Sequence, residues 1–185
     1  MKSSFTCPLP PSVNEYLGKR VAFSGGRYFV QVYETTKAKE FKKYMKMLIQ
    51  REVIKNGWDK TGEFEYVICE IDAYIPQKKR DTDNMFKCLL DSFTESDLIY
   101  DDSMIKPRVR EIYIDSINPR LEVTLYKDEK IGVFKNTEHL EAFKNKNCYN
   151  CKRLKRNCSL LKKSLENRIV PEVDFKNMEC EKKSE

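Results

Sequence analysis

The sequence predicts an α/β (α+β) fold, in which a mixed β-sheet of about five strands is flanked by two helices and followed by a small Cys-rich helical tail. Three observations support this prediction. The 185 residues suffice for one hydrophobic core and a small appendage. A content of 40% hydrophobic and 11% aromatic residues disfavours disorder. Segments that alternate like strands are interrupted by two segments with helical spacing.

The first half of the chain predicts two strands and a long helix. Residues 8–14 contain three prolines, which fix φ and remove donors, so this segment is an extended stretch and a turn. The Gly-Gly pair at 25–26 is a hairpin turn into the β-branched and aromatic residues 27–33. Thr35 or Thr36 is a suitable N-cap for an amphipathic helix that runs from Ala38 to about residue 56.

The second half predicts three strands and one helix. Residues 64–75 are apolar on both faces near their middle, which is typical of a strand inside a sheet. A helix over residues 83–93 places Met85, Leu89 and Phe93 on one face. Residues 105–115 and 120–126 are strands joined by a turn. The predicted order is therefore β, β, α, β, α, β, β.

The positive charge is concentrated towards the C-terminus. The net charge is +6, but residues 144–168 hold nine Lys or Arg against the single Glu166, a local sum of +8. Four of the seven cysteines also follow residue 144. This shift divides the chain into a core of residues 1–130 and a basic Cys-rich tail of residues 131–185.

The composition also bounds the compartment and the chemistry. No run of 18 apolar residues exists, and the first residues lack an apolar stretch of signal-peptide length, so we expect no membrane partner and a reducing, cytoplasmic location. In that setting cysteines are buried residues, metal ligands or reactive thiols rather than disulfides. The only histidine, His139, excludes chemistry that needs two or three histidines.

Acidic residues occupy two connections between predicted elements. Asp81 and Asp83 lie where a strand leads into a helix, and Asp101 and Asp102 lie just before the next strand. If these carboxylates meet, they repel one another unless a cation intervenes, and oxygen ligands without histidine suit Mg²⁺. Lys87, four residues after Asp83, shares its helical face and would support phosphodiester hydrolysis by stabilising developing charge.

The same residues have a purely structural interpretation. Asp81 and Asp83 favour a helix start as capping and dipole residues, and Lys87 could be a simple i,i+4 partner of Asp83. Asp101 and Asp102 could form a turn. The D-x-D-N pattern alone does not decide between these interpretations.

Four short motifs in order resemble the RusA family of Holliday junction resolvases. These are Pro10-Pro11-Ser12-x-Asn14, then Asp81-x-Asp83-Asn84-x-x-Lys87, Leu90-Asp91, and Asp101-Asp102-Ser103-x-Ile105, spread over residues 8–126. The resemblance implies a homodimeric α/β endonuclease that nicks four-way DNA junctions symmetrically with Mg²⁺. It assigns the acidic site to Asp81, Asp83 and Asp102, with Asp101 beside them, and the site lysine to Lys87. The chain departs from the family in a first strand shortened before Pro8 and in the Cys-rich tail.

Basic and aromatic residues are candidates for contacts with DNA. Lys78, Lys79 and Arg80 adjoin the acidic residues and could hold phosphates, although a solvated charged loop is the structural alternative. We also assign DNA binding to Asn14 of the first motif and to four basic residues of the tail: Lys152, Arg153, Lys155 and Arg156. Tyr16, Tyr28 and Phe29 could stack on opened bases, but we favour a place in the core for them.

The tail carries the spacing Cys148-x2-Cys151-x6-Cys158-x21-Cys180. The first pair has the spacing of a zinc half-site, and four thiolates could close a structural Zn²⁺ site in a module too polar to have a large core. His139 is a substitute ligand, with an ordinary surface histidine as its alternative. The alternative for the cysteines is chance thiols in a Lys-rich helix.

These observations predict a Mg²⁺-dependent, homodimeric endodeoxyribonuclease that resolves Holliday junctions in DNA recombination and repair. Two alternatives remain open. One is a metal nuclease that acts on other branched or hybrid substrates. The other is a non-catalytic, zinc-stabilised nucleic-acid-binding protein with a structural acidic cluster.

Overall fold

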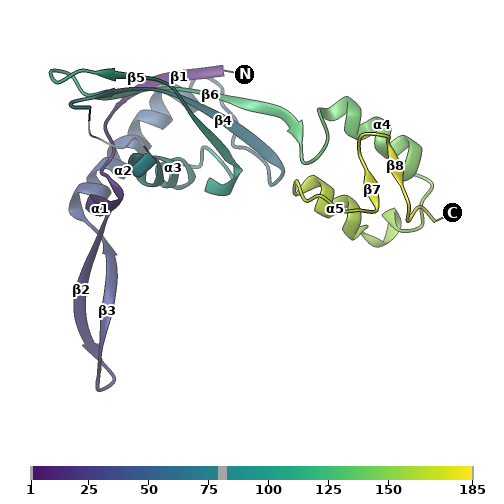
Figure 1. Cartoon of the computed structure of the whole chain (residues 1–185), viewed down its shortest axis with the longest axis horizontal. Helices are drawn as coiled ribbons and strands as arrows, with labels where there is room; N and C mark the ends of the chain where they lie inside the picture. Colours follow the sequence, from purple (N-terminus) through teal and green to yellow (C-terminus); the bar gives the residue numbers. More distant parts are fainter. Residues whose placement is uncertain (1, 79–82, 185) are drawn as a thin grey trace. The chain divides into compact units, whose positions relative to one another are not determined.

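The computed structural model describes residues 2–78 and 83–184, and for Asp83 and Lys155 it describes the main chain alone. These residues form a mixed α+β fold, as predicted. The elements follow one another in this order (Figure 1): β1 Lys2–Pro8, α1 Val13–Tyr16, β2 Leu17–Ser24, β3 Arg27–Glu34, α2 Thr36–Ile49, the π-helical turn η1 Gln50–Ile54, β4 Glu65–Ile75, the 3₁₀ turn η2 Asp83–Met85, α3 Phe86–Glu95, the 3₁₀ turn η3 Asp102–Met104, β5 Ile105–Ile114, β6 Arg120–Ile131, α4 Thr137–Asn147, the 3₁₀ turn η4 Leu154–Arg156, α5 Ser159–Leu165, β7 Val173–Asp174 and β8 Glu179–Cys180.

The chain forms two compact units. The first comprises Met1–Thr61 and Val67–Tyr126, and the second comprises Gly62–Tyr66 and Lys127–Glu185. The boundary expected after residue 130 falls inside β6, because this strand continues to Ile131. The second unit also takes in the five residues 62–66, the last two of which begin β4.

The sheet of the first unit has four strands in the order β1-β6-β4-β5. β4 is an interior strand, as predicted, and runs parallel to β5, whereas β1 runs antiparallel to β6. The prediction of about five strands in one sheet is wrong, since β2 and β3 form a separate hairpin. The first strand pairs at the edge of the sheet: residues 2–8 all pair with β6, and Pro8 is tolerated because it ends an edge strand.

One face of the sheet builds the core. Alternate residues of β4, from Val67 to Ile75, are buried against apolar residues of α2 and α3, such as Met45 and Leu89. The opposite face of β4 is apolar only at Ile68, and further along it carries Glu70, Asp72 and Tyr74, which are partly exposed. The prediction that both faces are apolar therefore holds only at the start of the strand.

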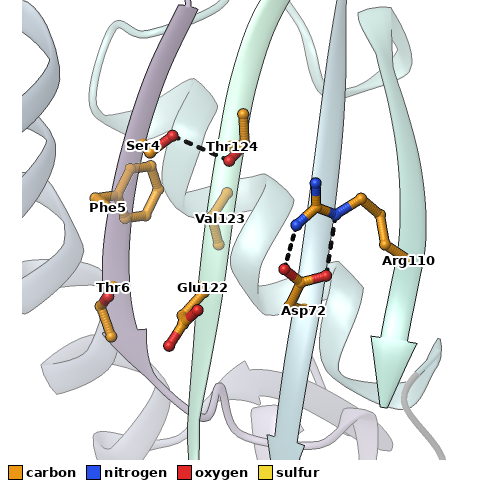
Figure 2. A pocket seen from close by; sticks show the side chains of 8 residues that line it. All are labelled: Ser4, Phe5, Thr6, Asp72, Arg110, Glu122, Val123 and Thr124. Atoms are coloured by element: carbon orange, nitrogen blue, oxygen red, sulfur yellow. Dashed lines mark hydrogen bonds and ion pairs between the residues drawn. The ribbon is translucent and has the colours of Figure 1, made fainter.

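Polar and aromatic side chains pair across the open face of the sheet. Arg110 of β5 binds Asp72 of β4 through two nitrogen atoms, beside a shallow hollow that Ser4, Thr6 and Thr124 help to line (Figure 2). Tyr74 stacks on Tyr113, with ring centroids 4.8 Å apart. This hollow contains none of the predicted site residues.

The long helix begins where the sequence predicts. Thr35 is the N-cap, and its hydroxyl accepts a hydrogen bond from Ala38 N at 3.3 Å. Phe41, Met45 and Leu48 lie on the buried face. None of the helices in the described part of the chain combines the length and the apolar composition needed to cross a membrane.

The hairpin β2–β3 extends away from the helices of the first unit (Figure 1). Gly25 and Gly26 form its tip with φ of 59° and 77°, a conformation that favours glycine. Tyr28 is 78% exposed and Phe29 48% exposed, so the prediction that they belong to the core is wrong. It is right for Tyr16, which precedes the hairpin and is buried. Strand composition alone does not show whether either face of a hairpin meets a core.

The second unit has its own small core. Phe134, Phe143, Leu160 and Val173 are buried together between α4, α5 and the hairpin β7–β8. Gly132 adopts φ of +55°, and a Cβ atom there would lie 2.0 Å from the carbonyl oxygen of Ser164. The tail is therefore a packed module with a short hairpin rather than helical alone.

Candidate functional site

Two of the predicted site residues, Asp83 and Lys87, lie at the start of α3. Asp83 begins η2 directly before this helix, and its side chain lies outside the described part of the structure, as do Lys79, Arg80 and Asp81 entirely. Lys78 is exposed, and so is Asn14 on α1. Because α1 contacts η2, Asn14 lies on an element next to the start of α3.

Lys87 forms an ion pair with Asp91, one turn further along α3. Its Nζ lies 3.3 Å from Asp91 Oδ1 in an i,i+4 pair. The Lys87 side chain is 53% exposed and that of Asp91 only 17%. The Lys87 side chain is therefore half-exposed, and a largely buried carboxylate holds its ammonium group.

Asp91 belongs to a polar network that the sequence analysis did not predict. Tyr16 Oη lies 2.5 Å from Asp91 Oδ2 and 3.0 Å from Glu34 Oε1. Burial, followed by the hydrogen bond to Asp91, raises the pKa of Tyr16. The network joins α1, the end of β3 and α3, and so fixes the helix that carries Lys87.

The almost fully buried Lys42 completes this network. Its Nζ lies 2.6 Å from Glu34 Oε1 and 2.6 Å from Glu95 Oε1. Burial alone would lower the pKa of Lys42, but its hydrogen bonds outweigh this effect and the pKa is raised. The hydrogen bond from Lys42 is the main cause of the lowered pKa of Glu34.

We expect the Lys42 network to stabilise the fold at neutral pH and to lose this effect in acid. The pKa of Glu34 is lower in the folded state than in the unfolded state, where it is about 4.3. This difference stabilises the folded state at pH values above the unfolded pKa, and the contribution disappears as the pH falls through the folded pKa. Lys42→Met should lower the free energy of unfolding by about 1–3 kcal/mol at neutral pH, because two partly exposed carboxylates lose their cation.

Urea unfolding of both proteins at neutral and acidic pH would measure this effect. The control is Lys43→Met, which changes the neighbouring exposed lysine. If Lys42→Met and Lys43→Met lose equal stability, the network does not contribute as expected.

The second acidic group follows α3. Asp101 is the N-cap of η3, and its Oδ1 accepts a hydrogen bond from Ser103 N at 3.0 Å. The Ser103 hydroxyl, followed by this main-chain bond, lowers the pKa of Asp101. Asp101 thus has the turn role foreseen as its structural alternative, while Asp102 beside it is exposed.

Hydrogen bonds fix the loop before η3 beside the start of β4. Trp58 Nε1 donates to Leu98 O at 3.1 Å, and Tyr100 N donates to Thr61 Oγ1 at 3.0 Å. Asp101 and Asp102 therefore lie near the beginning of β4, whereas Asp83 follows its end. α3 lies between the two groups in the chain and contacts both η2 and η3.

The acidic residues supply only oxygen atoms, which are the ligands that Mg²⁺ prefers. Among the side chains that the structure describes, no three of His, Cys, Asp or Glu already stand as a set that could hold a metal ion. The two carboxylates of the D-x-D-N motif, Asp81 and Asp83, lie outside the described part of the structure.

The second unit presents the remaining candidates. Lys152, Arg153 and Arg156 are exposed around η4, and the side chain of Lys155 is not described. Cys148 and Cys151 are buried, and Cys158 and Cys180 are partly buried. His139 Nδ1 accepts a hydrogen bond from Lys135 N at 3.3 Å within the first turn of α4. This bond gives His139 a local structural role.

An α+β core with acidic residues before and after one helix, and an accessible lysine on that helix, has the groups that metal-assisted phosphodiester hydrolysis uses. The family model Endodeoxyribonuclease RusA matches residues 8–126. The chain therefore belongs to this family, as its motifs suggested. Membership supports a role as an endodeoxyribonuclease at Holliday junctions, and the family acts on branched DNA and is normally metal-dependent. No curated protein matches the chain.

Proposed function

We propose that this protein is a Mg²⁺-dependent endodeoxyribonuclease that resolves Holliday junctions by paired symmetric nicks in DNA recombination and repair. The observation that supports this most strongly is the family match over residues 8–126. That segment contains every acidic residue proposed for the site, together with Lys87. Apart from residues 62–66, the second unit lies outside it.

Asp81, Asp83 and Asp102 would hold the magnesium ion, with Asp101 as an outer or alternate ligand. The fit rests on the donor set, which is all carboxylate, and on the exposure of Asp101 and Asp102. When bound, the ion would activate water and neutralise charge on the phosphate. Ser103 orients the Asp101 carboxylate and keeps it ionised, which favours binding of a cation.

Lys87 would stabilise the negative charge that develops on the phosphate. Its pairing with Asp91, which Tyr16 holds in turn, supports this role because a positioned charge needs little reorganisation during the reaction. Lys78, Lys79, Arg80 and Asn14 would bind the DNA backbone around the same end of α3.

A homodimer would match the two-fold symmetry of the junction. The hairpin β2–β3 supports it: Val21, Phe23 and Val30 are each more than 60% exposed, and a two-stranded hairpin is marginally stable alone. Sedimentation should therefore give a dimer, and Phe23→Ser combined with Val30→Ser should weaken it. A wild-type monomer that makes paired symmetric nicks would contradict this assembly.

The decisive experiment is incubation of the purified protein with a labelled four-way junction, with and without Mg²⁺. Linear duplex, flap and RNA–DNA hybrid substrates serve as comparisons. We expect paired nicks in the junction that require Mg²⁺. Preferential cutting of the flap or the hybrid would indicate a nuclease of another specificity. Binding without any cleavage would indicate a nucleic-acid-binding protein.

We propose that the basic tail adds electrostatic affinity for DNA. Lys152→Gln, Arg153→Gln and Arg156→Gln together should weaken junction binding and lower the slope of log Kd against log salt by roughly 0.9 for each phosphate that the tail no longer neutralises. Changing the three exposed lysines of α2, Lys39, Lys43 and Lys46, to Gln is a control of equal charge. Equal effects of the two sets on the salt slope would show that net charge alone matters.

A further inference from the structure

The first two cysteines of the second unit lie in one tight turn. Cys148 caps the C-terminal end of α4, and Cys151 N donates to Cys148 O at 2.8 Å. Leu154 N then donates to Cys151 O at 3.1 Å, which continues the turn into η4. Both cysteines are buried.

The other two cysteines arrive from separate elements. Cys158 is the N-cap of α5 and follows Asn157, whose φ of 59° reverses the chain. Cys180 lies in β8 opposite Val173. Asn147, next to Cys148, donates through its amide to Met178 O at 3.1 Å and so fastens α4 to the start of β8.

Three of the four cysteines share one core. Cys148 is buried in the core of the second unit, and Cys158 and Cys180 pack against that core. Cys151 Sγ accepts a hydrogen bond from Ser184 N at 3.4 Å. Main-chain N–H groups that bond to sulfur are the usual outer support of metal-bound thiolates.

We propose that Cys148, Cys151, Cys158 and Cys180 bind one zinc ion and that this ion is structural. Four sulfur ligands suit Zn²⁺, and a closed set of four leaves no open position for catalysis. The inference concerns the second unit only and does not depend on the proposed nuclease activity.

The architecture of the unit explains why an ion would be useful. Its core consists of a few residues held by two short helices and a hairpin of two-residue strands. A core of this size supplies little stability without a cross-link such as a disulfide or a structural metal ion. Among the described side chains, no three of Cys, His, Asp or Glu stand as a set that could hold a metal ion. The proposal therefore requires that zinc binding draws the sulfur atoms together, as happens where metal binding is coupled to folding.

The cysteines of the first unit provide a contrast. Cys7 and Cys69 are buried in the main core, and desolvation raises the pKa of each thiol. Cys88 is buried on α3 in the same core. Because these three serve as packing residues, they are suitable controls for the zinc proposal.

Elemental analysis of the full chain, prepared in zinc-replete medium, tests the proposal. We expect about one zinc per chain. Cys151→Ser and Cys180→Ser should each lose most of the metal, whereas Cys88→Ala should retain it. Cys158→His, which keeps a zinc ligand, should retain more metal than Cys158→Ser.

Replacement by Co²⁺ gives a readout that is independent of stability. Tetrahedral thiolate coordination should produce visible absorption bands and sulfur-to-metal charge-transfer bands, which Cys180→Ser would weaken or remove. Protein without zinc, or a Cys151→Ser, Cys180→Ser double variant that keeps its zinc, would overturn the proposal. Neither result would bear on Mg²⁺-dependent cleavage, which is measured separately.

Discussion

Asp102→Asn is expected to reduce cleavage of a four-way junction by a factor on the order of 10³ or more, because the amide keeps the shape of the side chain but removes a charged metal ligand. Asp83→Asn should have the same effect. Binding of the junction should remain or become tighter in both variants, because each removes a negative charge that repels DNA. Single-turnover cleavage and binding without Mg²⁺ measure the two effects separately.

Asp97→Asn is the matched control for this prediction. Asp97 lies in the same connection after α3, is exposed and pairs with Lys60. It loses the same charge, but we assign it no place in the site. Asp101→Asn should give an intermediate loss if Asp101 supports the site from outside the metal shell. A variant of Asp83 or Asp102 that nicks at nearly the wild-type rate would remove that residue from the proposed site.

The fold could be predicted where local pattern and tertiary packing agree. Thr35 caps α2 as expected because an N-cap depends on neighbouring residues alone. β4 is interior because its apolar run is longer than an edge strand would need. Local pattern left β1 out of the predicted order, because pairing with a distant strand is decided by the rest of the chain. It also placed Tyr28 in the core, because contact with a core is decided in the same way.

The site could be predicted in its chemistry but only partly in its contacts. The sequence pointed to Lys87, and the structure shows it accessible on α3, but its partner is Asp91. Asp91 belongs to one of the family-like motifs, but that motif does not indicate a pairing with Lys87. The hydrogen bond between Tyr16 and Asp91 joins residues 75 positions apart, and no local spacing signals such a bond. Only the burial of a tyrosine beside a polar helix face could have suggested it.

The acidic groups illustrate the same limit. Residue types and connections indicated that Asp83 and Asp102 occupy element ends. In a β-α-β unit, however, the connection after the first strand and the connection before the second belong to opposite ends of parallel strands. The pairing of Val67 with Ile105 places Asp102 near the start of β4. The proposal that both groups hold one ion therefore rests on the motifs shared with the family and on the contacts of α3 with both η2 and η3, and not on spacing along the chain.

Lys87→Ala is expected to lower the single-turnover rate by a factor on the order of 10² with a smaller change in junction affinity, as for other preorganised electrostatic groups. The competing interpretation treats Lys87 as an ordinary helix-surface partner of Asp91. An exposed i,i+4 pair stabilises a helix by only about 0.3–0.5 kcal/mol, so that interpretation predicts an almost unchanged rate. Measuring the cleavage rate at saturating enzyme therefore separates the two.

Asp91→Asn sharpens this test because it alters the support of Lys87 and leaves the ammonium group in place. If the pair positions the lysine, Asp91→Asn should lower the rate less than Lys87→Ala, and Lys87→Ala combined with Asp91→Asn should be no worse than Lys87→Ala alone. Unfolding curves of all three variants would exclude a general loss of structure. A Lys87→Ala protein that loses affinity but keeps its rate at saturation would make Lys87 a contact to the DNA backbone, because a group that acts only in the transition state cannot behave in that way.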